Sequence, residues 1–214
     1  MAIVAVKGRH PLQQGMTLLE VLVSAAITLI TVMSVVSLHV AGTRLLIKQQ
    51  QQLRLTQGLN DAMQLLSAEL LRAGYSSSAL PYRLAGSEQV IAAAPSSSTP
   101  SLSFLYQQSL QQWQVTTFRY KPSVDILQYC YKPVAFSEGD LPTMDAEWVC
   151  DAGAVRSLVD QSVIKIRDFY FRQTEFERKR GRFLTLEISI TGELTAAPQW
   201  RKTVRNQLTI RNSY

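Results

Sequence analysis

The sequence predicts an α+β protein in which a long N-terminal α-helix, with a transmembrane first half, packs on antiparallel β-sheet. Three observations support this fold class. From Val21 to Thr43 the chain carries no Asp, Glu, Lys or Arg, which is enough residues to cross a bilayer core. Helical spacing of leucines continues after this run, and strand-like alternation of apolar residues dominates the C-terminal third.

The first segment, residues 1–15, is interpreted as a leader that precedes a transmembrane helix over residues 16–42. Its basic residues predict that this end stays in the cytoplasm while the remainder is exported. Polar residues and Gly15 separate these charges from the apolar run, so cleavage at Gly15 would leave the apolar segment on the mature chain. Glu20 is the one acid at the start of this helix, and an ionisable group in an apolar span costs about 2.5–3.5 kcal/mol, which favours a functional role.

Hydroxyl-bearing residues recur along this helix at spacings of three and four positions, together with Glu20. At 100° per residue they form one narrow polar stripe. Small hydroxyl residues on one face allow helices to approach closely in membranes. Alternatively, each hydroxyl binds a carbonyl of its own helix. The stripe consists of Thr17, Glu20, Ser24, Thr28, Thr31 and Ser34.

Residues 43–74 are predicted to continue as an amphipathic helix that lies on the globular domain. Apolar residues repeat at intervals of four, four, three and four, which is typical of one buried helix face. Gly74 is a plausible C-terminal cap. A dimeric coiled coil is the rival interpretation, although the segment lacks ordered flanking charges. The stripe consists of Leu55, Leu59, Met63, Leu66 and Leu70.

Residues 75–214 are predicted to form an antiparallel sheet domain, because successive strand patterns are joined by short connections. Two short strands are expected near Gln89–Ala92 and Leu102–Gln107, before a hairpin. The remaining strands are expected at Trp113–Tyr120, at Asp125–Tyr131, around Ile164, Ile166 and Tyr170, around Leu184, Leu186, Ile188 and Ile190, and around Val204, Leu208 and Ile210.

Composition argues against most catalytic and nucleic-acid functions. The net charge of +6 is spread along the chain without a nucleic-acid-binding motif, so no nucleic acid is expected as a partner. The two histidines, His10 and His39, both precede the polar domain. This argues against Ser-His, Cys-His and His-metal chemistry there. We therefore expect no enzyme activity, no catalytic residues and no cofactor.

The only two cysteines are Cys130 and Cys150. Because the exported compartment is oxidising, a disulfide between them is favoured over two buried thiols. A loop of this size gives an entropic stabilisation of about 3 kcal/mol.

Two charged segments are interpreted as solvated surface. Arg178 to Arg182 is the densest basic run and lies between two strand patterns, so it indicates an exposed hairpin tip. Acidic residues in the preceding part of the chain suggest calcium, but their spacing does not fit an EF-hand loop. No metal site is predicted there. These acidic residues are Glu138, Asp140, Asp145, Glu147 and Asp151.

The stretch from Gly15 to Val21, which reads GMTLLEV, resembles the type IV prepilin signal, with Met in place of the usual Phe at its second position. The resemblance implies cleavage between Gly15 and Met16 by prepilin peptidase, followed by N-methylation of the new Met16 amine. It also implies that Glu20 serves filament assembly. Its carboxylate would then pair with the Met16 ammonium of a neighbouring subunit, whereas the alternative is a capping charge that pairs with its own Met16.

The segment ELLRAGY, from Glu69 to Tyr75, is similar to the segment that closes the long helix in minor pilins of the PilW type. The resemblance implies a pilin-like, non-enzymatic subunit that primes type IV pilus assembly. Its implied partners are other minor pilins, the major pilin, prepilin peptidase, the inner-membrane assembly platform and the lipid bilayer.

The implied location is the bacterial inner membrane, with a single pass and a periplasmic C-terminal domain, and later the pilus, with the tip as a candidate position. One alternative is the type II secretion minor pseudopilin J, which shares the helix and a two-sheet domain. A more distant alternative is a membrane-tethered ligand-binding or adhesin domain.

Overall fold

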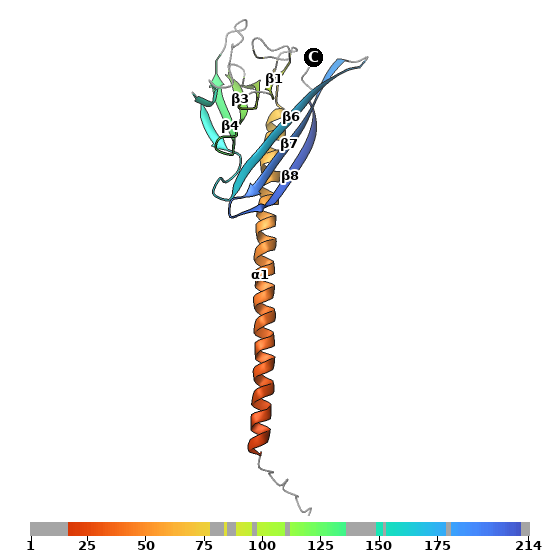
Figure 1. Cartoon of the computed structure of the whole chain (residues 1–214). Helices are drawn as coiled ribbons and strands as arrows, with labels where there is room; N and C mark the ends of the chain where they lie inside the picture. Colours follow the sequence, from red (N-terminus) through yellow and green to blue (C-terminus); the bar gives the residue numbers. More distant parts are fainter. Residues whose placement is uncertain are drawn as a thin grey trace, which may run out of the picture. The chain divides into compact units, whose positions relative to one another are not determined.

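A computed structural model describes residues 17–77, 84, 89–95, 98–109, 112–135, 149–151, 153–178 and 181–210. Within them, one long helix is followed by eight strands. The chain divides into two compact units between Gln49 and Gln50. The first unit contains the N-terminal part of the helix, and the second contains the rest of the helix together with all strands. Figure 1 shows these elements, with labels on α1, β1, β3, β4, β6, β7 and β8.

Helix α1 runs from Leu18 to Leu70. In the second unit it buries one face, and the buried residues include all five members of the predicted leucine-rich stripe. Burying a side chain of this size contributes about 1.5–3 kcal/mol relative to exposure. The stripe is therefore part of the core of a single chain, which accounts for it without a dimeric coiled coil.

The strands form two antiparallel sheets, as the fold prediction requires. The five-stranded sheet has the order β1-β2-β3-β4-β5, and the three-stranded sheet has the order β6-β7-β8. Every neighbouring pair is antiparallel. The strands are β1 Ile91–Ala94, β2 Ser101–Ser109, β3 Gln112–Lys121, β4 Ile126–Val134, β5 Ala154–Ser157, β6 Ile164–Arg178, β7 Gly181–Leu194 and β8 Ala197–Ile210.

One apolar core contains residues from α1 and from both sheets. The helix approaches the three-stranded sheet closely, because a Cβ atom on Gly192 of β7 would lie 2.8 Å from Leu59 Cδ2. The Asn206 side-chain amide of β8 donates a hydrogen bond of 2.8 Å to the Ser67 hydroxyl of α1. Figure 1 shows the three strands of this sheet beside the last turns of α1.

Several element bounds differ from those expected. α1 ends at Leu70 rather than near Ala73, because the next residues make tighter turns with bonds such as Ala73 N–H to Leu70 O. Strand β1 lies two residues later than predicted, since Ile91–Ala94 pairs with Ser101–Phe104. Strand β5 was not predicted. All four of its residues are exposed, so they carry no alternating pattern.

Candidate assembly surfaces

The N-terminus of α1 is capped by Thr17. The Glu20 N–H donates to the Thr17 carbonyl at 3.0 Å and lies 3.4 Å from the Thr17 hydroxyl. Thr17 and Glu20 therefore occupy the N-cap and third helical positions of a Thr-x-x-Glu sequence. This sequence signal was available but was not used in the prediction. Gly15 and Met16 lie outside the described residues.

The Glu20 side chain is exposed in the first turn of α1. There a carboxylate is favoured by the unpaired amides and the helix dipole. Among the residues that the structure describes, its carboxylate has no hydrogen bond or ion pair that would already neutralise it. Met16, whose amine is the alternative partner within the same chain, lies outside the described residues.

The first unit presents an apolar helix surface. Its large side chains from Leu18 to Ile47 are exposed, with Leu18 at 79% and Leu38 at 74%. By length and composition α1 could cross a membrane. Together with its place near the N-terminus, this is consistent with anchoring in the inner membrane.

The hydroxyl stripe is satisfied within the helix itself. Ser24 donates to Val21 O at 3.0 Å, and Thr28 donates to Ser24 O at 2.7 Å. Thr31 donates to Ile27 O and Thr28 O, and Ser34 donates to Ile30 O at 2.8 Å. The self-bonding alternative thus describes these hydroxyls in the single chain. It leaves their exposed faces available for close packing by another helix.

The segment from Glu69 to Tyr75 attaches the end of α1 to strand β2. Gly74 has a φ of 70°, a conformation that favours glycine, and its N–H donates to Leu105 O at 2.8 Å. The Tyr75 carbonyl accepts a bond of 2.8 Å from Gln107 N–H. The backbone of this segment therefore extends the pairing of β2, and Gly74 has the positive φ of a helix cap, although α1 itself ends four residues earlier, at Leu70.

Side chains complete this attachment. The Glu69 carboxylate is buried, accepts a bond of 3.2 Å from the Tyr106 hydroxyl, and lies 3.1 Å from Arg72. The Arg72 guanidinium also lies over the Tyr106 ring, 5.8 Å from its centroid. Burial and the nearby Glu69 carboxylate raise the pKa of Tyr129. The residues that carried the resemblance thus have a structural task, which is to fix the helix to the sheet.

Cys130 of β4 and Cys150 form a disulfide. A helical turn at residues 149–151 carries Cys150, and the bridge lies in a second apolar cluster with Leu105 and Val115.

Of the acidic residues considered for calcium, only Asp151 is described, and it lies 3.7 Å from Arg119. Among the described residues, no group of three or more His, Cys, Asp or Glu could hold a metal ion. Arg178 and Gly181 are paired at the ends of β6 and β7, whereas the tip between them and the exposure expected for Arg178 to Arg182 lie outside the described residues.

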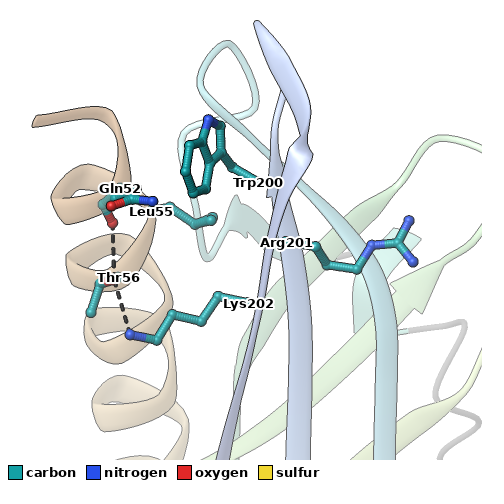
Figure 2. A pocket seen from close by; sticks show the side chains of 6 residues that line it. All are labelled: Gln52, Leu55, Thr56, Trp200, Arg201 and Lys202. Atoms are coloured by element: carbon teal, nitrogen blue, oxygen red, sulfur yellow. Dashed lines mark hydrogen bonds between the residues drawn. The ribbon is translucent and has the colours of Figure 1, made fainter. Parts of the chain in front are cut away.

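A groove of about 300 Å³ lies between α1 and the start of β8. Figure 2 shows Trp200 and Lys202 pointing toward the helix, whereas Arg201 points to the other side of the strand. The Lys202 ammonium donates to the Thr56 hydroxyl at 3.1 Å. Sequence reasoning missed this groove, because its helical and strand residues are more than 140 positions apart.

The chain resembles one known protein family over most of its length. A family model described as prepilin peptidase-dependent protein B matches residues 48–210, which is more than half of the chain. The chain belongs to this family. The match supports a type IV pilus-related, pilin-like protein and is not specific to the PilW type. No curated protein and no solved structure matches this chain.

The family match begins at residue 48, whereas the prepilin-type stretch covers Gly15 to Val21. The two observations do not overlap and come from different parts of the chain. Both indicate a pilin-like protein that depends on prepilin peptidase. This identity is that of a structural subunit, consistent with a non-enzymatic role.

Proposed function

We propose that this protein is a minor pilin, related to the PilW type, that helps to prime type IV pilus assembly. Prepilin peptidase cleaves it between Gly15 and Met16, and the new Met16 amine is N-methylated. The α1 segment at residues 16–42 anchors the chain in the inner membrane, with the sheet domain in the periplasm. On extraction, this segment packs into the filament beside other minor pilins and the major pilin.

The observation that carries this proposal is the exposed apolar first half of α1, which begins with an acid that no described residue neutralises. An apolar surface of this kind requires lipid or other helices around it. A carboxylate in such surroundings requires a cation. The Met16 ammonium of a neighbouring subunit meets this requirement, because cleavage after Gly15 creates that charge.

The test replaces Glu20 with Ala and follows both cleavage and incorporation into pili. We expect processing by prepilin peptidase to continue and recovery of the subunit with its partner pilins to be lost. Asp61→Ala is the matched control, since Asp61 is an exposed acid on the same helix. Normal incorporation of the Glu20 variant would refute the assigned role of this residue.

The contact face of the helix is tested separately. Ser24→Leu and Thr31→Leu place bulkier, apolar side chains in the hydroxyl stripe. This stripe consists of Thr17, Glu20, Ser24, Thr28, Thr31 and Ser34. Both changes should reduce co-purification with other minor pilins more than Val23→Leu does, because Val23 lies outside the stripe. Equal effects of all three changes would contradict a packing role for this face.

The division of the strands into two sheets also fits the alternative that the protein is a minor pseudopilin of a type II secretion system. Co-purification distinguishes the two filaments. We expect partners from the pilus rather than secretion pseudopilins, and the opposite result would reassign the protein within the superfamily.

A further inference from the structure

Strand β8 has one edge without a neighbouring strand in the part of the chain that the structure describes. It pairs with β7 alone, and no backbone hydrogen bond from another segment reaches residues 198–209. Figure 1 shows β7 between β6 and β8. Native proteins usually shorten, bulge or cover such edges, but β8 is 14 residues long and pairs without a register shift from Arg201 to Ile210. The edge is therefore long and regular enough to receive a further strand.

The hydrogen-bonding groups of this edge belong to every second residue of β8. The Gln207 N–H donates to the side-chain carbonyl of Asn206 at 2.9 Å, which places it outside the ladder with β7. In antiparallel pairing, residues that bind the neighbouring strand alternate with residues that do not. Thr203, Arg205 and Thr209 therefore also direct their N–H and C=O groups away from β7. From Thr203 to Thr209 these groups extend over about 20 Å, at about 3.3 Å per residue.

On the side that faces α1, β8 has apolar side chains that are covered only in part. Trp200, Val204 and Leu208 pack against the core and are half-buried. Their neighbours on β7, Ile190 opposite Val204 and Leu186 opposite Leu208, are fully buried, because β7 has a strand on each side. An added strand with apolar side chains on this face would cover the β8 residues in the same way.

The other side of β8 is basic. Arg201 and Arg205 are exposed there, and the strand also contains Lys202 but no acidic residue. Arg201 already lies 3.0 Å from the Glu193 carboxylate of β7. Arg205 makes no ion pair with any residue that the structure describes. An acidic side chain on an added strand would compensate this charge.

These charges disfavour a second copy of the same strand at this edge. An antiparallel pair of two β8 strands centred on Thr203 would put Arg201 of each opposite Arg205 of the other. Like charges directly opposite each other are destabilising, and basic residues commonly protect edges from self-association. The same charges favour a partner strand of the opposite sign.

We propose that the free edge of β8 binds an extended, acidic segment of another protein by β-strand addition. The segment supplies backbone N–H and C=O groups to Thr203, Arg205 and Thr209. Its apolar side chains cover Val204 and Leu208, and its acidic side chains lie next to Arg205. The groove between α1 and the start of β8 lies on the apolar side of this edge and offers room for one side chain. Binding at this edge goes beyond the role proposed for α1, since it does not depend on the membrane span.

The probe is a fluorescent synthetic peptide in which Val and Glu alternate, added to the full chain in detergent. Fluorescence anisotropy measures its affinity, and amide hydrogen exchange locates it. We expect binding, with slower exchange at Thr203, Arg205 and Thr209. A peptide in which Val and Lys alternate should bind at least about tenfold more weakly, because cross-strand charge pairs become repulsive.

The charge on β8 is tested by reversal. Arg205→Glu should weaken binding of the Val-Glu peptide about fivefold, because one attractive pair becomes repulsive. Arg172→Glu is the matched control, since Arg172 is an exposed cation on β6 of the same sheet, away from this edge. This control should bind the peptide as the wild type does.

The backbone of the edge is tested without a change of charge. Thr203→Pro removes one N–H, and proline is tolerated where an edge N–H points away from the sheet. It should weaken binding at least about fivefold, because a backbone hydrogen bond is lost. Thr203→Val is the matched control, since both changes remove the hydroxyl that contacts Thr191 but only proline lacks the N–H. A Val-Glu peptide with N-methyl groups on alternate amides should also lose binding, which tests strand pairing on the wild-type chain.

Four results would overturn the proposal. Unchanged affinity of Thr203→Pro and of the N-methylated peptide would refute strand addition. Equal affinity for the Val-Glu and Val-Lys peptides would refute an acidic partner. Protection from exchange elsewhere in the chain, with none on β8, would locate the peptide at another site. A wild-type dimer that Thr203→Pro dissociates would show that a second copy occupies the edge.

Discussion

The Arg167 guanidinium lies 2.8 Å from the Glu193 carboxylate at the position where strand β6 departs from regular pairing with β7. Ile166 pairs with Gly192 and Asp168 pairs with Thr191, so Arg167 is the extra residue of a β-bulge. Its second contact is with Asp125 in the β3–β4 turn of the other sheet. The bulge also receives a bond from the Tyr120 hydroxyl at Ile166 O. The bulge is therefore one place where the two sheets are joined, and a second is the hydrogen bond of 3.0 Å from the Gln173 side-chain amide of β6 to Ile91 O of β1.

Removal of the Arg167 guanidinium should loosen this junction. In Arg167→Met, the buried Glu193 carboxylate retains only Arg201, and Asp125 loses its partner. Hydrogen bonds to a buried carboxylate stabilise the folded chain, so we expect a measurable loss in the free energy of unfolding. Urea unfolding of the full chain in detergent measures this change. Arg172→Met, on an exposed position of β6, should cost less than about 0.5 kcal/mol, and equal losses would contradict the assignment.

Acid should destabilise the same junction. The hydrogen bond from Arg167 lowers the pKa of Glu193, despite the opposing effect of burial. This stabilisation is complete above the ordinary Glu pKa of about 4.3 and is lost as the pH falls through the lower folded-state value. Unfolding curves from pH 6 to pH 3 should therefore show declining stability. Glu193→Gln should flatten this decline, and an unchanged slope in that variant would assign acid lability to other groups.

Alkaline pH should lower the stability of the packing between the end of α1 and the five-stranded sheet. Burial raises the pKa of Tyr129, and the same cause raises the pKa of Tyr106. The folded chain then holds these protons more tightly than the unfolded chain does. Stability is complete below the ordinary Tyr pKa of about 10 and falls as the pH rises above it. Tyr129→Phe should reduce this alkaline slope in circular dichroism titrations, and a slope equal to that of the wild type would exclude Tyr129 as a source.

The helix and the three-stranded sheet should show a specific coupling between Gly58 and Ile164. A Cβ atom at Gly58 would lie 2.5 Å from Ile164 Cδ1, whereas Ala otherwise favours the helix by about 1 kcal/mol. Gly58→Ala with Ile164→Val, which removes that methyl group, should be about 1 kcal/mol more stable than the sum of the single changes. Chemical denaturation of the four proteins measures the cycle. Ile166→Val should instead be additive with Gly58→Ala, because Ile166 does not contact this position.

The disulfide should contribute to the stability of the five-stranded sheet. Cys130 lies on β4, and its bridge to Cys150 closes a loop with a sequence separation of 20. Cys130→Ala with Cys150→Ala should lower the free energy of unfolding by about 3 kcal/mol. Reduction of the wild type with dithiothreitol should produce a similar loss, while leaving the double variant unchanged. Equal stability of the oxidised wild type and the double variant would refute this contribution.

The elements that sequence patterns predicted are those with one buried face and regular pairing. The spacing from Leu55 to Leu70 identified the buried face of α1, and the alternation from Leu184 to Ile190 identified the inner face of β7. Antiparallel pairing followed from short connections between strands. In each case the periodicity is set by contacts with a single apolar core.

The bulge at Arg167 could not be predicted in this way. The Ile166 backbone binds Asp125 and Tyr120, which are more than 40 residues away in the chain. After the bulge the alternation is reversed, so Phe169 and Phe171 are buried and Tyr170 is 42% exposed. The pattern of Ile164, Ile166 and Tyr170 therefore located the strand correctly but did not reveal the change of face. The groove between α1 and the start of β8 was missed for the same reason, because it depends on the packing of segments that are far apart in the sequence.

The hydroxyl stripe of α1 gives the helix a surface whose internal bonding does not depend on its surroundings. Each hydroxyl from Ser24 to Ser34 already donates to a carbonyl of its own chain. Transfer of the helix from lipid to a bundle of neighbouring helices therefore breaks no hydrogen bond of these groups and requires no new one. These four hydroxyls therefore add no hydrogen-bonding cost to the proposed passage from membrane to filament. Glu20 differs from these hydroxyls, because the free energy of its carboxylate depends on whether a neighbouring subunit supplies a cation. On the proposed function, Glu20 is therefore the residue of the stripe that selects the neighbouring subunit.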